Sequence, residues 1–455
     1  MEREEVFYKT VLKIALPVTL QSLLQSSFGV ADQVMTGQLG SGSIAGIGLG
    51  GKFSSVYSVL ISAVAAVAGI MIAQYMGKKD GREVGRSFCV SLLVAIALAV
   101  VFTGICTVFS GQIMGIYTKD DSTRQIAAEY LWIVAFSFIP MAVEALVATL
   151  LRCMEAASLP LYASVFGAMV NTGLNYVLIF GRFGFPRMGV GGAAWATVIS
   201  RIAGCVLCTA LFGVYYGRRY RKKEVKLKIS FYMGKSGRMQ YLGILLPILF
   251  CELFWSLGEN VYTAIYGNMG TQACAAMTLT VPVQVLMIGA LSGIAQATGI
   301  LIGKYLGGGE YEKAYRNSKK LMGYGLSGSV FLSLILVAAG RFYVQIYQVE
   351  ETVKVLGTQI LTAFALISPV KVQNMILGGG VLRSGGKTKY VMVIDFVGTW
   401  LFGVPLGFLA AFVWKLEIPY VYFILSLEEC VRFFISIMVF RRRTWMNKIG
   451  ALNED

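Results

Sequence analysis

The sequence predicts an all-α, polytopic membrane protein with twelve transmembrane helices in two parallel six-helix repeats. Of its 455 residues, 56% are hydrophobic and only 14% are charged, and the mean hydropathy is +0.68. Soluble domains carry about 25% charged residues. Apolar runs of about 20 residues or more, which cross a bilayer at about 1.5 Å per residue, recur along the chain. The two halves also match each other without a gap.

The internal match identifies a duplication. Aligning the chain with itself at an offset of 230 residues pairs identical residues along both halves, among them Pro17 with Pro247, Gly37 with Gly267, Gly69 with Gly299, Tyr75 with Tyr305, Gly77 with Gly307 and Arg86 with Arg316. An even number of spans in each copy returns the chain to its starting side of the membrane. The copies are therefore parallel and related by an axis along the membrane normal, which is a ground plan of secondary transporters.

The apolar runs locate the individual spans. We expect them at 11–36, 44–74, 87–109, 124–151, 160–180, 190–215, 241–266, 274–303, 318–339, 354–383, 388–411 and 418–440. The first run follows an acidic start and has no small-residue cleavage site, so it predicts a span and not a removable signal. We expect an N-lobe at 1–217, a basic cytoplasmic linker at 218–240, and a C-lobe with a short basic tail at 241–455.

The basic residues indicate the orientation of the chain. Its formal charge is +16, and Lys and Arg gather in alternate connections between spans, most densely at 215–238. Basic loops stay in the cytoplasm, so this asymmetry predicts both termini there, in a multi-pass protein of the inner (plasma) membrane. The charges do not form one basic domain with interleaved aromatic residues, which argues against a nucleic-acid partner. The partner that we expect instead is the lipid bilayer.

No pattern in the chain predicts catalysis or a cofactor. It contains no histidine, and its eight cysteines are scattered almost wholly through the spans. The segment GGGVLRSGGKT, residues 378–388, resembles a phosphate loop, but five residues separate Gly380 from Gly386 where that loop has four, and an apolar helix precedes it. We interpret it as a glycine-rich cytoplasmic turn. The chain is then no enzyme and needs no cofactor, and an ion gradient must supply the energy for pumping.

Polar residues inside the N-lobe spans predict a small cation site. Gln25 and Asp32 share a stripe of span 1, while Asn171 and Asn175 are four apart on span 5. Counting the helical rise places Asp32, Asn175 and Thr197 of span 6 in the same half of the membrane. A buried ionisable group in a span faces a partner or a water-filled cavity. An oxygen-lined cation site and an interhelical hydrogen-bond network are both compatible with this pattern.

The C-lobe carries different chemistry at the equivalent positions. Tyr262 replaces Asp32 under the 230-residue offset, while Glu252 and Glu259 follow one face of span 7. Span 10 carries Lys371, a rare basic group at membrane depth. These four C-lobe residues are candidates for substrate binding or coupling, because such an acid can exchange a proton for a cationic substrate. A structural ion pair between Glu252 and Lys371 is the alternative.

Two further charged positions have simpler interpretations. Glu428 and Arg432 are four apart on span 12, so we expect them to neutralise each other. Asp395, near one end of span 11, is expected to be solvated or to cap its neighbour.

Several segments together resemble the multidrug and toxic compound extrusion (MATE) family, of the bacterial multidrug efflux type and the MOP superfamily architecture. They are ADQVMTGQLG in span 1, the turn at Leu151 and Arg152, NTGLNYVLIFG from Asn171, MGVGGAAWATVISR from Met188 and CELFWSLGENVYTAIYGNMG from Cys251. The likeness runs from Pro17 to about Trp445.

The resemblance implies export of bulky, often cationic and aromatic drugs in exchange for protons or sodium ions by alternating access. The family's N-lobe cation site matches Asp32, Asn171 and Thr197, but its second acid is Asn175 here. Sodium at Asp32 is the only metal ion we expect, and we expect a monomer. A lipid-linked oligosaccharide flippase of related architecture is the alternative function, with Arg201 and Lys371 as candidates to meet diphosphate. A membrane-embedded enzyme would need a nucleophile with a base partner, and none is visible.

Overall fold

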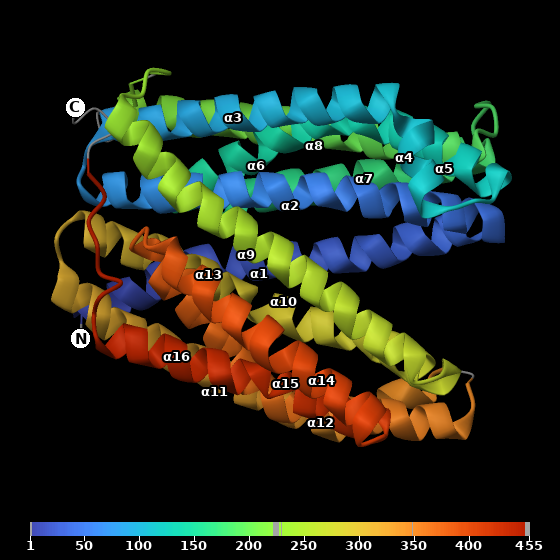
Figure 1. Cartoon of the computed structure of the whole chain (residues 1–455). Coiled ribbons are helices and arrows are strands. Elements are labelled where there is room, and N and C mark those ends of the chain that lie inside the picture. Colours follow the sequence, from blue (N-terminus) through green and yellow to red (C-terminus); the bar gives the residue numbers. More distant parts are fainter. Residues whose placement is uncertain (1, 222–226, 229, 348, 451–455) are drawn as a thin grey trace. The chain divides into compact units, whose positions relative to one another are not determined.

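The computed structural model describes residues 2–221, 227–228, 230–347 and 349–450, and regular structure in these ranges is entirely helical (Figure 1). The elements, in chain order, are α1 (Glu2–Gly37), α2 (Ser41–Gly77), α3 (Gly81–Val108), α4 (Ser110–Tyr117), α5 (Asp121–Val134), η1 (Ala135–Ser137), α6 (Phe138–Cys153), α7 (Ser158–Phe180), α8 (Gly189–Arg221), α9 (Lys235–Asn268), α10 (Thr271–Gly307), α11 (Tyr311–Gln345), α12 (Glu351–Asn374), η2 (Met375–Leu382), α13 (Thr388–Phe396), η3 (Val397–Gly403), α14 (Val404–Phe408), η4 (Leu409–Val413), α15 (Ile418–Ser426) and α16 (Glu428–Arg441).

The predicted fold class is confirmed. In the described part of the chain, 11 helical stretches are long and apolar enough to cross a membrane. The twelfth predicted span, 418–440, corresponds to α15 and α16, which are 9 and 14 residues long and meet at Leu427. Together they cover the predicted length, although neither piece alone is long enough to span. The protein is thus an all-helical, multi-pass membrane protein.

Local sequence sets the first turn of two helices in the N-terminal half. The Asp80 carboxylate accepts hydrogen bonds from the backbone N–H groups of Arg82 and Glu83, both at 3.1 Å, at the start of α3. The Asp120 carboxylate does the same for the N–H of Thr123 at 2.9 Å, at the start of α5. These contacts satisfy N–H groups that lack a partner within the helix.

Several predicted spans are interrupted helices. The span predicted at 124–151 changes from α5 to α6 through the 3₁₀ turn η1, which ends just before Pro140, a residue that cannot donate a backbone hydrogen bond. The spans predicted at 354–383 and 388–411 contain the π-helices η2, η3 and η4. Each π-helical turn holds more than 3.6 residues, so it rotates the side chains that follow it.

The interpretation of residues 378–388 as a glycine-rich turn was wrong for most of the segment. Residues up to Leu382 belong to the π-helix η2, the next two are helical, and only 385–387 form the connection to α13. The physical reason is burial: Ile376, Leu377 and Val381 are fully buried, and η2 packs against α10. An apolar face of this kind stabilises helical structure despite three consecutive glycines.

The chain forms two compact units. The N-terminal unit contains Leu20–Ile72 and Asp80–Lys235, and the C-terminal unit contains Met1–Thr19, Ala73–Lys79 and Ser236–Glu454. The first turns of α1 and the last turn of α2 therefore group with the C-terminal half of the chain. The lobe boundaries expected at 217 and 241 stay a prediction.

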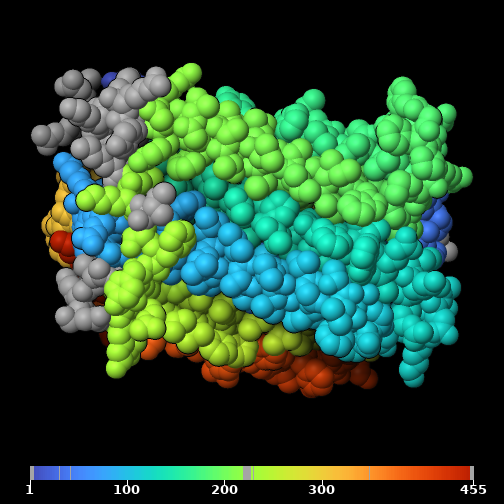
Figure 2. Space-filling view, turned by 90° about the horizontal axis from the view of Figure 1, so that it is seen from above, coloured from blue at the N-terminus to red at the C-terminus, as the bar shows by residue number. Residues whose placement is uncertain are grey.

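In the N-terminal unit, α8 packs against α5, α6 and α7, and α6 also packs against α3. Figure 2 shows α3 in blue and α8 in green on one face of this unit, with teal helices between them. The buried contact among α6, α7 and α8 includes Val147, Leu151, Ala163 and Cys208. This packing places α7 and α8 beside each other along their length, which positions the polar residues described below.

In the C-terminal unit, α12 is the central element. It packs against α10, α11, α15 and α16, and η3 packs against α16 (Figure 1). Its buried side chains, such as Ile360 and Phe364, join residues of α9, α10 and α15 in one apolar core. Pro369 leaves the carbonyl of Ala365 without its helical donor, and the Ser368 hydroxyl donates to that carbonyl at 3.3 Å.

The duplication is visible where α2 and α10 end in the C-terminal unit. A Cβ at Gly77 would lie 1.9 Å from the carbonyl oxygen of Lys304, and a Cβ at Gly307 would lie 1.8 Å from that of Gln74. Gln74 and Lys304 are themselves 230 residues apart, as are the two glycines. Each glycine thus allows the partner helix's backbone to approach, and the contact is reciprocal between repeat-related residues.

A segment after α16 is fastened to the end of α2, within the same unit. Gln74 is fully buried, and its amide nitrogen donates to the carbonyls of Ser384 and Asn447 at 2.7 and 3.1 Å. Its amide oxygen accepts from the backbone N–H of Ile449 at 2.8 Å. The Tyr75 hydroxyl donates to the carbonyl of Gly450 at 2.6 Å. We call the three contacts with Asn447, Ile449 and Gly450 the tail clamp.

Candidate functional site

In the N-terminal unit, one carboxylate is held by an amide from a second helix. Asp32 lies in the part of α1 that belongs to this unit, and its carboxylate accepts a hydrogen bond of 2.5 Å from the Asn175 side-chain nitrogen of α7. Asn175 is fully buried, whereas Asp32 is half-buried. The Asn175 amide oxygen is buried without a hydrogen-bond partner. The amide therefore presents an unused acceptor beside a carboxylate.

Four further polar side chains extend this cluster. The Asn171 amide oxygen accepts from the Asn175 nitrogen at 3.3 Å, and the Asn171 nitrogen donates to the Ser200 hydroxyl at 3.5 Å. Thr197 of α8 donates to its own helix, at the carbonyl of Ala193, 3.0 Å away. Thr197 and Asp32 both interact with the Tyr130 hydroxyl of α5. Residues of α1, α5, α7 and α8 thus meet in one oxygen-rich cluster.

Gln25 differs from Asp32 in burial. Its side chain is exposed, although it was predicted on the same stripe as Asp32. Gln21, one turn earlier, is buried and binds two other helices: its nitrogen donates to the Ser164 hydroxyl at 2.6 Å and its oxygen accepts from Arg152 at 2.9 Å. Gln21 therefore joins helices, whereas the role of Gln25 at the cation site stays a prediction.

The donor set of this cluster suits a proton or a monovalent cation. It offers one carboxylate with amide and hydroxyl oxygens, and among the residues described no group of three or more Asp, Glu, Cys or His side chains gathers to hold a metal ion. Hard oxygen ligands with one formal charge match sodium better than a divalent ion. A bound cation would also satisfy the Asn175 oxygen, whose burial without a partner costs about 1 to 3 kcal/mol.

A second charged group in this unit was not predicted. The Glu144 carboxylate of α6 interacts electrostatically with Arg152 and Arg201. Its two oxygens lie 3.5 and 3.6 Å from the place that a Cβ would take at Gly204 of α8. This acid is therefore compensated by arginines, unlike Asp32.

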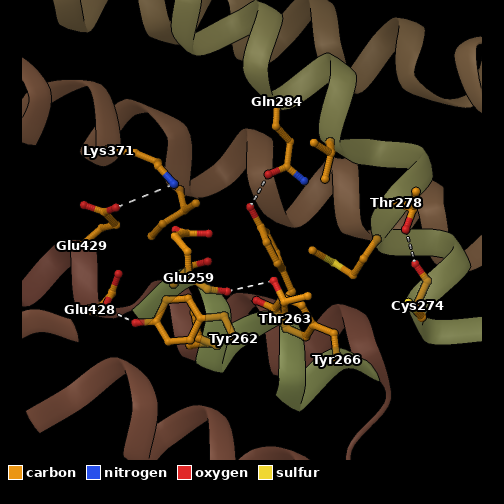
Figure 3. Close-up of a pocket in the computed structure, with 16 residues that line it drawn as sticks. Glu259, Tyr262, Thr263, Tyr266, Cys274, Thr278, Gln284, Lys371, Glu428 and Glu429 are labelled. Atoms are coloured by element: carbon orange, nitrogen blue, oxygen red, sulfur yellow. Dashed lines mark hydrogen bonds and ion pairs between the residues drawn. The ribbon is translucent and has the colours of Figure 1, made fainter. Parts of the chain in front are cut away.

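In the C-terminal unit, charged and aromatic side chains line a cavity of about 210 Å³ (Figure 3). Three of the four predicted C-lobe residues line it, namely Glu259, Tyr262 and Lys371. The other lining residues include Tyr266, Gln284, Tyr422, Glu428 and Glu429. The Tyr422 hydroxyl donates to the Gln284 side-chain oxygen at 2.9 Å.

Arg432 compensates two of the cavity's acids. Its guanidinium lies 3.4 Å from Glu428 and 3.9 Å from Glu429, and it donates to the Thr399 hydroxyl of η3. The ion pair expected between Glu428 and Arg432 is confirmed. The Tyr262 hydroxyl donates to Glu428 at 2.5 Å.

Glu429 has two more neighbours, both from α12. Its carboxylate accepts from the Asn374 amide at 2.8 Å, and it lies 3.9 Å from the Lys371 ammonium. Glu259, by contrast, is exposed to the cavity, and Figure 3 shows it directed into the space that Lys371 and Glu429 share.

Glu252 does not line this cavity, and its partner is Arg383 and not Lys371. It lies 3.4 Å from Arg383, which also lies 4.0 Å from Asp395. The alternative of a Glu252–Lys371 pair was therefore wrong, because Lys371 pairs with Glu429 and Glu252 with Arg383. Asp395 faces the same arginine and is not simply solvated.

Sequence reasoning missed Glu429 and Tyr130. Glu429 carries a readable signal, since two adjacent glutamates stand at the start of an apolar run with an arginine three and four residues later. Tyr130 carries none, because a tyrosine in a span is ordinarily a packing or interface residue.

A family model described as MatE matches residues 17–177 and 247–409, one segment in each half of the chain. "Probable multidrug resistance protein NorM" of Thermotoga maritima is 26% identical over 423 residues, covering 90% of this chain and 87% of that protein. "Uncharacterized transporter YisQ" of Bacillus subtilis is 24% identical over 473 residues, covering 98% and 99%.

A solved structure has the same fold. It is described as the outward-facing conformation of a multidrug resistance MATE family transporter of the MOP superfamily, and it matches with a TM-score of 0.85 at 18% identity, covering 96% of this chain and 95% of that one.

Proposed function

The chain belongs to the MatE family, and on that premise we propose that it is a secondary active multidrug efflux transporter, which exports bulky, often cationic compounds in exchange for protons or sodium ions by alternating access. Relatives named as multidrug resistance proteins support the export of drugs.

The proposed coupling mechanism rests on the hydrogen bond between the Asp32 carboxylate and the Asn175 amide nitrogen. The Asn175 amide oxygen is buried without a hydrogen-bond partner. An exchangeable ion needs a group with no fixed counter-charge bound to it. Asp32 meets this condition, because its hydrogen-bond partner is a neutral amide. A proton or sodium ion at Asp32 stabilises one arrangement of the transporter by its differential affinity, and release of the ion favours the other.

We propose that the cavity of the C-terminal unit is the binding site for the charged end of the cargo. Its volume of about 210 Å³ is smaller than a pocket for a whole drug, so it holds one charged group with the adjoining ring. Glu259 supplies the negative charge, and the rings of Tyr262, Tyr266 and Tyr422 supply surfaces on which an aromatic cation stacks.

The same proposal covers location and partners. We place the protein in the inner (plasma) membrane with both termini in the cytoplasm, as the basic connections predict. It works as a monomer, without a cofactor and without chemistry on its cargo. The flippase alternative needs unpaired basic groups to bind a diphosphate. Lys371 pairs with Glu429, and Arg201 interacts with Glu144, so neither residue favours this alternative.

Transport by purified protein in liposomes tests the proposal. A fluorescent organic cation is supplied outside, and an imposed gradient of either protons or sodium should drive its movement across the bilayer. Uptake that is the same with and without every gradient would rule out antiport. Comparing the two gradients at fixed membrane potential identifies the coupling ion.

A further inference from the structure

The charges around the C-terminal cavity nearly balance. Three carboxylates line it, from Glu259, Glu428 and Glu429, and one ammonium, from Lys371. Arg432 contacts two of the acids from behind. With all five groups ionised, the cluster keeps one net negative charge. One monovalent cation would therefore neutralise it.

Lys371 is the loosely held member of this cluster. Arg432 is buried, and it contacts Glu428, Glu429 and the Thr399 hydroxyl. The Lys371 side chain is 39% exposed, and its ammonium lies 3.9 Å from the Glu429 carboxylate, which is long for an ion pair. It also interacts electrostatically with Glu259 and Glu428. A lysine ammonium is a compact point charge on a flexible stem. It therefore supplies charge to the cavity without closing the space in it.

From this arrangement we infer that Lys371 sets the number of positive charges that the cavity accepts. Its ammonium takes the place beside Glu429 that a second cationic group of the cargo would otherwise occupy. A cargo with one cationic group leaves the cluster neutral, whereas one with two leaves an uncompensated positive charge in a site of low dielectric constant. The inference rests on the proposed function, because it names the cargo class of the same cavity.

Two small amines separate these cases. 4-Methylbenzylamine and 1,4-bis(aminomethyl)benzene share one ring and nearly the same size, and they differ by one ammonium group. Titration calorimetry on the full-length protein in lipid nanodiscs gives the affinity of each. The ratio of the two affinities is the measured quantity, so a general loss of binding does not affect it.

We expect the wild-type protein to bind the monoamine at least as tightly as the diamine. Lys371→Gln removes the ammonium and leaves the cluster with two net negative charges. It should move the ratio toward the diamine by roughly tenfold or more, because the second ammonium then reaches Glu429 without competition from Lys371. Lys371→Arg keeps the charge and should keep the wild-type ratio. Lys354→Gln is the matched control: Lys354 lies on the same helix, pairs with Glu351 at 3.5 Å and does not line the cavity, so the ratio should not change.

An unchanged ratio in folded Lys371→Gln protein that still binds both amines would overturn the inference. Failure of both amines to bind the wild-type protein would overturn it as well, because the cavity would then not be a cation site. The proposed antiport has a separate test: if the ratio shifts as expected but liposome uptake ignores every ion gradient, the inference stands and the coupling mechanism falls. Thermal unfolding of each variant establishes that it is folded.

Discussion

The Asp32 cluster of the N-terminal unit and the cavity of the C-terminal unit hold their hydrogen-bonded acids in different ways. In the N-terminal unit, Asp32 is joined to the neutral amide of Asn175. In the C-terminal unit, Glu428 and Glu429 are joined to the fixed cations Arg432 and Lys371. An acid with a neutral partner can exchange its ion, whereas an acid with a tethered cation keeps its counter-charge. After the duplication the two copies thus differ in the partners of their acids, as the proposed division between ion exchange and cargo binding requires.

Asp32→Asn should have the largest effect on transport. The change keeps the size of the side chain but removes its charge, so we expect gradient-driven uptake to fall at least about 100-fold, as for other charges essential to a step. Uptake into liposomes is the measurement. Asp121→Asn, at a side chain that is 83% exposed and paired with Arg124, is the matched control and should transport normally. Near-normal pumping by Asp32→Asn would remove this acid from the mechanism.

Arg432→Met tests whether the C-terminal acids depend on their fixed cation. The substitution leaves Glu428 and Glu429 buried without their main counter-charge, so we expect a loss of stability of about 3 to 5 kcal/mol. Thermal unfolding in detergent measures it. Lys354→Met removes a charge from a half-buried ion pair outside the cavity and should cost far less. Equal effects of the two substitutions would mean that Arg432 does not compensate the acids.

Asn175→Asp sharpens the N-terminal half of the comparison. A second carboxylate would meet Asp32 directly, and the pair would attract a monovalent cation more strongly. We expect the sodium concentration for half-maximal uptake to fall roughly tenfold. If sodium has no greater effect on this variant than on the wild-type protein, the Asn175 position is not part of the cation site.

The smallest effect is expected outside the membrane-spanning part, at the start of α5. Hydrogen bonds from Thr123 and Ser122 hold the pKa of the exposed Asp120 carboxyl below its ordinary value. A lowered pKa in the folded state contributes stability above the pKa of the unfolded chain, and that contribution is lost as the pH falls through the folded value. Asp120→Ala should therefore lower the unfolding temperature slightly at neutral pH and not at strongly acidic pH. A difference that persists in acid would assign the effect to something other than the carboxylate.

Much of the architecture was predictable because hydrophobic length and internal repetition are local or periodic properties. Eleven of the spans fall where apolar runs predict them. The depth argument put Asp32 and Asn175 in the same half of the membrane, and the structure joins them by a hydrogen bond. Whether they bind an ion stays a prediction. The depth argument works for these residues because both lie in uninterrupted α-helices.

The C-terminal side chains were harder to place, for a geometric reason. Between Lys371 and Arg383 lies the π-helix η2, so a face extrapolated at 3.6 residues per turn no longer holds beyond it. The partner of Glu252 is beyond that turn, and the partner of Lys371 comes from α16, which no spacing within α12 indicates. Pairing between helices far apart in sequence depends on packing that one chain's periodicity does not encode.

The tail clamp can form only when synthesis of the chain is nearly finished. The amide oxygen of Gln74 binds a backbone N–H that is 375 residues further along the chain. At about 5 to 20 residues per second, the ribosome delivers that partner roughly 20 to 75 seconds after it has made Gln74. During this interval the end of α2 lacks hydrogen bonds that the finished protein buries. The nascent chain is thus exposed there to chaperones and proteases until residues 447–450 arrive.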